Sequence, residues 1–321
     1  MTAETSRRVY VTGGNGFLGS SVVAGLAAQL GRGVDLVVSG DLRDPRHRVD
    51  GVSYETADVT RANDLLEQFQ RHKIDTVVHL AAIVNPGRDL TREDEYRVDV
   101  EGSRNVLDAC SATGVRRIVV SSSGAAYGYH ADNPDWIVET TAIRGNESFS
   151  YSHHKRLVEL MLEESRVWHP ELEQVVFRIG TILGATVKNQ ITALFEKKRL
   201  LRVAGSESPF VFAWDQDVVG AMVRAATDGP AGIFNLAGDG ALTVRQLAGI
   251  MGKKTITVPV GIIKLGLWAG RAVGATAHGP EQAKFLQYRP VLLNTKLKEE
   301  FGYTPEYTSR QAFEAWVAAR S

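Results

Sequence analysis

The stretch Val9-Tyr-Val-Thr-Gly-Gly-Asn-Gly-Phe-Leu-Gly19 decides the fold of this chain. An apolar run ends in Thr12 and opens into three spaced glycines, a pattern typical of a strand, a tight turn and a helix that bind a dinucleotide. Gly13 can adopt the turn conformation, Gly16 leaves room for a pyrophosphate, and Gly19 lets the helix pack closely on the strand. Because glycine-rich turns also occur for structural reasons alone, the prediction depends on the other motifs. The phosphate site predicted here, which includes the free N–H groups at the helix start, comprises Gly13, Gly16, Phe17, Leu18 and Gly19.

The composition favours a globular protein with a small-molecule substrate. The chain has 321 residues, of which 44% are hydrophobic, and its 37 basic residues balance its 37 acidic ones. A balanced charge gives no reason to expect a nucleic-acid or membrane partner. The single cysteine, Cys110, excludes an internal disulfide, and we find no ligand spacing typical of a metal site. A reducing, cytoplasmic location is expected.

Two segments of the chain bear on targeting. Residues 1–8 are polar and run directly into the first expected strand, which leaves no room for a secretory signal with an apolar core. The apolar stretch 258–274 is interrupted by Lys264 and Arg271. A membrane-spanning helix needs ~20 apolar residues, so we expect a buried helix there.

Strand-like and helix-like segments alternate along most of the chain. The strand-like runs are continuously apolar, as expected for a parallel sheet with helices on both faces. The sequence therefore predicts an α/β fold, a doubly wound parallel (Rossmann) sheet, followed from residue 243 by irregular helices that indicate a smaller C-terminal substrate-binding lobe. The expected helices cover 17–30, 61–71, 92–113 and 215–228, and the expected strands after the first cover 34–39, 76–80, 117–121, 174–178, 210–213 and 232–235. We expect the core to comprise 1–178 with 210–236 and the lobe 179–209 with 237–321.

Asp41 bears on the choice between NAD and NADP. It follows the second expected strand, about 20 residues after the glycine motif, where a carboxylate binds the ribose hydroxyls of an adenosine. Such a carboxylate would repel a 2′-phosphate, so NAD is favoured. The following Arg43, Arg46 and Arg48 could neutralise a phosphate, which leaves NADP open, and a solvated loop is the structural alternative.

A second motif, Tyr151-Ser-His-His-Lys155, opens an amphipathic helix. A spacing of four residues places Tyr151 and Lys155 on one helix face, where the ammonium would help the phenol to give up its proton. Ser121, Ser122 and Ser123 end an expected strand, at the sheet edge where α/β proteins bind ligands. One of these hydroxyls could bind a reacting substrate oxygen, whereas capping of the strand is the structural alternative for the others.

Taken in order, these motifs resemble those of extended short-chain dehydrogenases/reductases, in particular their NAD-dependent epimerase/dehydratase group. The matching segments are Thr12–Gly19, Asp58-Val59, His79-Leu80-Ala81-Ala82, Ser121–Ser123 with Tyr127-Gly128, Tyr151 with Lys155, Arg178, Trp214–Asp217, Asn235–Gly238, Arg289-Pro290 and Gly302–Pro305. The resemblance implies that Asp58 and Val59 border the adenine of NAD, and that Leu80, Ala81, Ala82 and Ser121 line the cofactor groove. It also implies a catalytic triad of Ser123, Tyr151 and Lys155.

The chain departs from that group at positions that concern the substrate. Family dehydratases carry an Asp-Glu pair where this chain has Gly124 and Ala125, so elimination of water lacks a catalyst. Nucleotide-sugar enzymes of the family tend to have an Asn where Thr181 stands, and a more apolar segment around Phe210 replaces their nucleotide-binding loop. We expect Thr181 and Phe210 to lie near the substrate. Asp99 replaces an expected Asn.

Several conspicuous side chains have structural interpretations. We expect His153 and His154 to be exposed or to support the site without catalysing, Tyr127 and Trp214 to be structural rings, and Cys110 to be a small core residue.

The function predicted from these features is an NAD(P)-dependent oxidoreductase that transfers hydride between a secondary alcohol and a ketone. The first alternative is a nucleotide-sugar 4-epimerase of the UDP-hexose type with a retained NAD, and the second is a non-catalytic NAD(P)-sensing protein. The resemblance further implies a homodimer formed through helices in 92–113 and 151–168.

Overall fold

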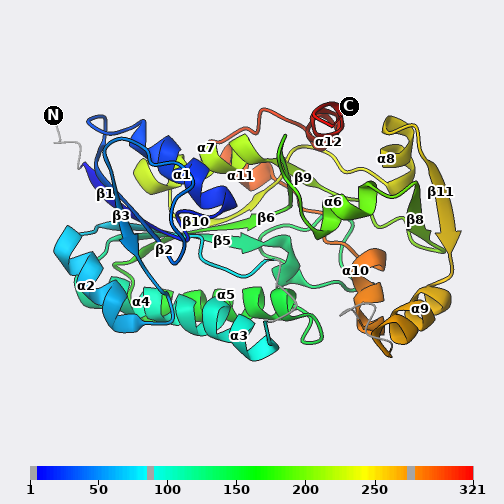
Figure 1. Cartoon of the computed structure of the whole chain (residues 1–321), viewed down its shortest axis with the longest axis horizontal. Helices are drawn as coiled ribbons and strands as arrows, with labels where there is room; N and C mark the ends of the chain where they lie inside the picture. Colours follow the sequence, from blue (N-terminus) through cyan, green and yellow to red (C-terminus); the bar gives the residue numbers. More distant parts are fainter. Residues whose placement is uncertain (1–5, 85–89, 273–278, 321) are drawn as a thin grey trace.

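A seven-stranded parallel sheet forms the centre of the protein in the computed structural model, which describes residues 6–84, 90–272 and 279–320. The strand order is β10-β6-β5-β4-β1-β2-β3, a doubly wound arrangement that confirms the predicted fold class (Figure 1). The strands are β1 (Arg7–Thr12), β2 (Val34–Asp41), β3 (Val52–Thr56), β4 (Thr76–His79), β5 (Arg117–Ser123), β6 (Glu173–Ile179) and β10 (Gly232–Leu236).

Helices cover both faces of the sheet, and each layer has its own apolar core. One face carries α1 (Phe17–Ala27), α7 (Asp215–Thr227) and α11 (Thr295–Glu299), and the other carries α2 (Ala62–His72), α3 (Arg92–Tyr96), α4 (Gly102–Thr113) and α5 (Ser150–Trp168). A π-helical turn, Arg97–Glu101, joins α3 to α4. The central strands β1, β4 and β5 are buried on both sides, which explains their continuous apolar runs.

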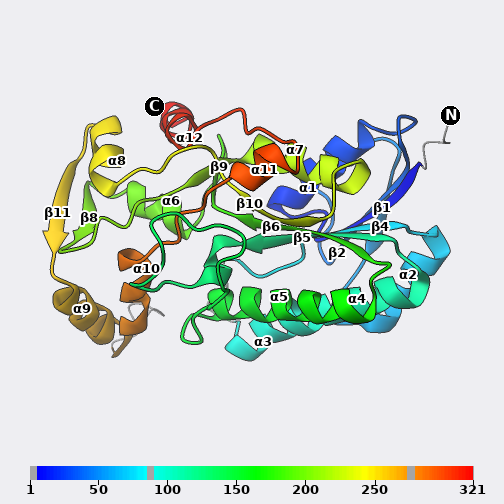
Figure 2. The same ribbon diagram turned by 180° about the vertical axis from the view of Figure 1, so that it is seen from behind.

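The remaining elements lie toward the opposite end of the molecule from the N-terminus (Figure 2), in the part predicted to be the smaller lobe. Its core is aromatic, and the rings of Phe195, Phe212, Phe313 and Trp316 pack against one another. The elements are β7 (Thr181–Leu183), α6 (Gln190–Phe195), β8 (Arg199–Val203), β9 (Phe212–Trp214), α8 (Val244–Ile250), β11 (Lys254–Val258), α9 (Val260–Ala272), α10 (Ala283–Gln287) and α12 (Ser309–Ala318).

The expected helices and core strands are present, with ends that shift by a few residues, but several aspects of the expectation were wrong. The edge strand β3 was not expected, because its half-exposed residues give no apolar run. The segment predicted as a core strand at 210–213 contributes β9, which pairs with β7 outside the main sheet. The strand β11 was not expected either, and it pairs with β8 in a separate two-stranded sheet. The division into core and lobe residues stays a prediction.

The helix expected to be buried in 258–274 is exposed. Its part within the described residues, α9, turns Ile262, Leu265 and Trp268 outward, and these side chains are 61%, 63% and 62% exposed. Residues 273 and 274 lie outside the described residues. None of the helices in the described ranges is both long enough and apolar enough to cross a membrane.

Candidate functional site

The glycine motif forms a tight turn between β1 and α1. Gly13 has a φ of +65°, and a Cβ added there would lie 2.8 Å from the backbone nitrogen of Ala81. A Cβ on Gly19 would collide with the carbonyl oxygen of Gly13 and lie 2.8 Å from the Cα of Gly14. Both positions therefore require glycine. The start of α1, at Phe17 and Leu18, leaves its first amide groups without helical acceptors, which makes the turn suitable for a phosphate.

The segment after β4 lies directly against this turn. The amide of Leu80 donates to the carbonyl oxygen of Thr12 at 3.1 Å, and the amide of Ala81 donates to the Thr12 hydroxyl at 3.4 Å. Ala82 follows in the same half-buried segment. The structure thus brings together the glycine turn and the residues predicted to line the cofactor groove.

Asp41 ends β2 beside the glycine motif, and its carboxylate already accepts several bonds. It accepts from the amide of Asn15 at 3.1 Å and from the amide of Arg43 at 2.9 Å, and it pairs with the Arg43 guanidinium at 3.3 Å. Asp41 is 7% exposed, whereas the Arg43 side chain is 71% exposed. The exposed arginine can move away from a carboxylate that is fixed by backbone amides, so this pair can accommodate a ribose.

Asp58 and Val59 follow β3 at the same edge of the sheet. Asp58 accepts from both the amide and the hydroxyl of Thr60, at 2.9 and 2.7 Å, which fixes the turn before α2. Val59 is buried, and a Cβ on Gly102 of α4 would press into it. Their predicted place beside an adenine is compatible with this position.

Ser121, Tyr151 and Lys155 meet at the carboxyl end of β5. The Lys155 Nζ donates to the carbonyl oxygen of Ser121 at 2.8 Å and lies 5.7 Å from the centre of the Tyr151 ring. Lys155 is 8% exposed, and within the described chain this carbonyl is its one hydrogen-bond acceptor, so two of its N–H groups stay available to a ligand.

The hydroxyls of the three serines have different partners. That of Ser121 donates to the carbonyl oxygen of His79 at 3.3 Å, and that of Ser122 is buried against Glu159. The Ser123 hydroxyl accepts from the amide of Ala125 at 3.1 Å, which leaves its own proton free to be donated. Ser122 is thus the serine whose role is structural.

His154 and Asp99 form a buried pair behind this site. Nδ1 of His154 lies 3.0 Å from Oδ2 of Asp99, and both residues are 4% exposed. The other carboxylate oxygen, Oδ1, accepts from the amide of Ile83 at 2.7 Å. Because His154 precedes Lys155, Asp99 links the π-helical turn and the segment after β4 to the helix that carries Tyr151 and Lys155. The sequence marked Asp99 as unusual but gave no sign of its partner.

His79 connects the same elements one layer deeper. Its Nδ1 lies 2.7 Å from the Thr12 hydroxyl, and its Nε2 lies 2.9 Å from that of Ser103. Burial, with a smaller contribution from Lys155, lowers the pKa of His79 from 6.5 to about 3. His79 is therefore neutral and structural at physiological pH.

The structural interpretations of other side chains are confirmed. Tyr127 is fully buried, burial raises its pKa to about 12, and its hydroxyl donates to Asn235 at 2.8 Å. Cys110 is buried in the core, and Trp214 stacks on Tyr307 in the lobe.

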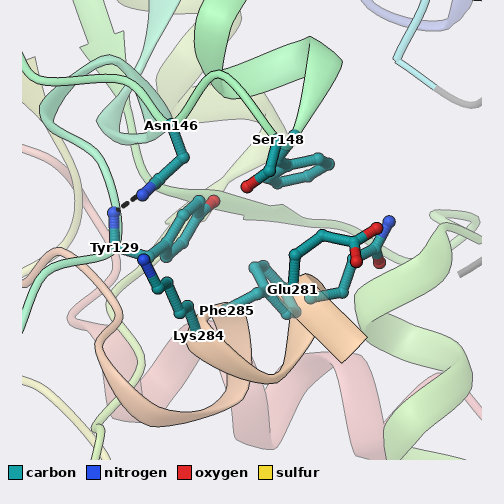
Figure 3. A pocket seen from close by; sticks show the side chains of 8 residues that line it. Tyr129, Asn146, Ser148, Glu281, Lys284 and Phe285 are labelled. Carbon is teal, nitrogen blue, oxygen red and sulfur yellow. Dashed lines mark hydrogen bonds between the residues drawn. The ribbon is translucent and has the colours of Figure 1, made fainter. Parts of the chain in front are cut away.

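An aromatic pocket lies beside Tyr151, where the core meets the lobe. Tyr129, Phe149 and Phe285 contact one another, with ring centres 5.2 to 6.1 Å apart, and Phe149 lies 6.4 Å from Tyr151. Figure 3 shows the rings of Tyr129 and Phe285 next to each other in the pocket lining, with Ser148 nearby. The sequence did not reveal this pocket, because its walls come from distant segments.

A half-buried cation, Arg289, lies next to the pocket. Its guanidinium carbon lies 3.8 Å from the centre of the Phe210 ring and 5.4 Å from that of Phe285. Its Nη1 donates to the carbonyl oxygen of Ser208 at 2.8 Å. Its Nε is buried without a partner, and within the described residues no carboxylate pairs with it. Burial lowers the pKa of Arg289 to about 9. The guanidinium is thus suited to bind an anionic ligand group.

Two residues, Phe210 and Thr181, were predicted to lie near the substrate. Phe210 lies behind Arg289, and Thr181 lies in β7. Phe210 is 3% exposed and covered by Arg289. Thr181 is half-buried in β7, where its amide donates to Val211. Among the described residues, no group of three or more His, Cys, Asp or Glu side chains could hold a metal ion.

Comparison with known proteins places the chain in a family. The model of the NAD dependent epimerase/dehydratase family matches residues 9–237. An uncharacterized protein of Mycobacterium tuberculosis is 26% identical over 97% of this chain and 84% of its own length. A UDP-glucose 4-epimerase of Erwinia amylovora is 32% identical over 57% of this chain and 56% of its own. The solved structure of a Thermotoga maritima UDP-glucose 4-epimerase with UDP-glucose has a TM-score of 0.73 and 21% identity, and covers 98% of each chain. The chain belongs to the NAD dependent epimerase/dehydratase family, a family of enzymes.

Proposed function

We propose that this enzyme binds NAD and transfers hydride reversibly between a secondary alcohol and a ketone. The observation that carries the proposal is the contact of Lys155 with the Ser121 carbonyl oxygen beneath the Tyr151 ring. This contact supports a role of Tyr151 and Lys155 in proton transfer, because it lies at the sheet edge where α/β enzymes bind ligands.

The residues of the groove fit NAD. The glycine turn offers amides to the pyrophosphate, the buried Asp41 carboxylate suits two ribose hydroxyls, and the free N–H groups of Lys155 suit the second ribose. Bound there, the nicotinamide would supply the acceptor or donor of the hydride.

Each residue of the triad then has one task. Tyr151 takes the proton of the substrate alcohol, or returns it to the ketone oxygen. Lys155 stabilises the phenolate by its charge, and the Ser123 hydroxyl donates to the reacting oxygen and holds it in place. Gly124 and Ala125 are buried and carry no acid, so these positions offer no catalyst for removal of water.

A substrate panel tests this reaction. The protein is incubated with NAD and secondary alcohols that range from aromatic to anionic, and NADH formation is followed by absorbance. We expect net NADH formation with at least one alcohol, and Lys155→Met should lower the rate at least 100-fold. No net NADH formation with any of the alcohols would contradict a dehydrogenase.

The second candidate is a nucleotide-sugar 4-epimerase with retained NAD. It is favoured by Arg289, a half-buried cation without an acidic partner in the described chain that suits a diphosphate, and by the similarity to UDP-glucose 4-epimerases. This candidate predicts interconversion of UDP-sugars without net change of cofactor. The other alternative, a non-catalytic sensor protein, predicts NAD binding without turnover of any substrate. Arg289→Met should raise the KM for a diphosphate-containing substrate at least tenfold and leave NAD binding unchanged.

We also propose that the protein is a homodimer formed through α4 and α5. These two helices lie side by side on one face of the sheet (Figure 2), and α5 exposes Leu160, Val167 and Trp168. Exposed apolar side chains on paired long helices suit an isologous helix bundle. Sedimentation velocity should give a dimer that Val167→Glu converts to monomer, and a monomeric wild type would contradict the proposal.

A further inference from the structure

The tip of the lobe carries an exposed apolar surface that the proposed reaction does not use. It consists of three side chains on α9 and two on the neighbouring sheet of β8 and β11, which we call the α9 surface. Its members are Leu201, Ile256, Ile262, Leu265 and Trp268, exposed by 38%, 44%, 61%, 63% and 62%. Leu201 and Ile256 are register partners in the β8–β11 sheet, so they stand side by side on one face.

The helix α9 is apolar on more than one side. Ile263 and Leu267 are half-buried, one turn apart, and α9 contacts α10 and the turn Pro280–Gln282. Ile262, Leu265 and Trp268 nevertheless point away from the protein. An ordinary surface helix has a polar outer face, so the outer face of α9 is suited to a second apolar environment.

Basic residues lie near the α9 surface, four of them at the end of the β8–β11 sheet that is farther from α9. Arg199 and Lys254 are register partners at the start of β8 and β11, two residues before Leu201 and Ile256 and thus on the same face. Lys197 and Lys198 precede β8, and Lys264 lies on α9. Within the described residues, none of these five cations forms an ion pair, and all five are exposed.

The acidic residues nearby do not cancel this charge. Glu207 is paired with Arg202 at 2.8 Å, and the two other acidic residues nearby, Glu196 and Glu281, are outnumbered by the five cations. The balanced charge of the whole chain therefore conceals a local excess of positive charge at the lobe tip.

We infer that the α9 surface docks on a lipid bilayer that carries anionic lipids. Apolar side chains with a tryptophan among them enter the interfacial region of a bilayer, while lysine side chains extend toward the phosphates. A second copy of this chain is a poorer occupant, because an isologous contact would bring the same unpaired cations face to face. Since α9 contacts α10, which lines the aromatic pocket, the bilayer lies against the substrate lobe and away from the glycine turn.

Vesicle binding tests this inference with the full chain saturated with NAD. Sucrose-loaded vesicles of phosphatidylcholine alone, or with 30% phosphatidylglycerol (about a third), are pelleted with the protein, and the bound fraction gives a partition coefficient. We expect at least tenfold stronger partitioning onto the anionic vesicles, weakened by salt.

Variants separate the apolar and the charged contributions. Trp268→Glu should lower partitioning at least tenfold, and Lys197→Glu with Lys198→Glu at least fivefold. Trp136→Glu, at another exposed tryptophan, is the matched control and should change it less than twofold. Leu265→Gln repeats the apolar test if thermal unfolding shows that Trp268→Glu is misfolded.

Three results would overturn the inference. The first is no binding of the wild type to anionic vesicles, and the second is an equal effect of Trp268→Glu and Trp136→Glu. The third is a dimer of the wild type in sedimentation velocity that does not bind vesicles and that Trp268→Glu dissociates. This result would make the α9 surface a contact between copies.

Discussion

Replacement of Asp99 probes the link between the cofactor groove and the helix that carries Tyr151 and Lys155. Asp99→Ala removes the acceptor of the Ile83 amide and the partner of His154, two interactions that the structure places at 2.7 and 3.0 Å in a 4% exposed site. Each buried group left without a partner costs about 1–3 kcal/mol, so we expect a loss of about 2–6 kcal/mol in the free energy of unfolding.

Asp99→Asn is the matched control. The amide oxygen can still accept from Ile83, and the amide NH2 can donate to His154 Nδ1 when that nitrogen is unprotonated. The expected cost is below about 1 kcal/mol. His154→Ala completes a double-mutant cycle, for which contacts of this kind give coupling energies of about 0.5–3 kcal/mol.

Urea unfolding monitored by circular dichroism measures these energies, and kcat shows whether α5 keeps its position. We expect Asp99→Ala to lower kcat, and Asp99→Asn to preserve most of it. Equal destabilisation by Asn and Ala, or additive single effects in the cycle, would refute the pairing of Asp99 with His154.

Three further predictions concern the glycine turn, His79 and Asp41. Gly19→Ala should lower the free energy of unfolding by about 1–3 kcal/mol and abolish NAD binding, because its Cβ would collide with the backbone of Gly13. The control is Gly249→Ala, in α8 with open space around it, which should stabilise the protein by up to about 1 kcal/mol. His79 has a pKa of about 3 in the folded protein, against 6.5 when unfolded. The contribution of the neutral imidazole to the free energy of unfolding is therefore complete above pH 6.5 and is lost as the pH falls toward 3. His79→Gln should reduce the slope of unfolding free energy against pH by up to about 1.4 kcal/mol per pH unit in that window, and an unchanged slope would contradict a neutral buried imidazole. Asp41→Asn should weaken NAD binding at least tenfold and NADP binding less, as measured by calorimetry, whereas equal effects on both would argue against a ribose contact.

The doubly wound sheet was predictable because buried parallel strands leave continuous apolar runs between helical periods. β3, β8 and β11 were not, since short, half-exposed strands depend on pairing partners that the local sequence does not reveal. The exposure of α9 was also unpredictable, because an apolar run signals burial whether or not the fold supplies a cover.

The cofactor side of the candidate site was predictable for a related reason. The glycine spacing and the four-residue interval of Tyr151 and Lys155 are local patterns with local geometric consequences. Asp99 and His154 lie 55 residues apart in sequence, and Arg289 stacks on Phe210 and bonds to Ser208, which is 81 residues away. No local pattern could have paired them.

The most direct test of the proposed chemistry is the single substitution Tyr151→Phe, assayed for turnover and for NAD binding on the same preparation. Tyr151→Phe removes the proton carrier and keeps the ring beside Lys155 and Phe149. We predict at least a 100-fold loss of kcat on whichever alcohol or UDP-sugar the wild type accepts. At 100 times the Kd, NAD should still stabilise the variant by about 2.7 kcal/mol, as it should the wild type. Full activity of Tyr151→Phe would contradict the account.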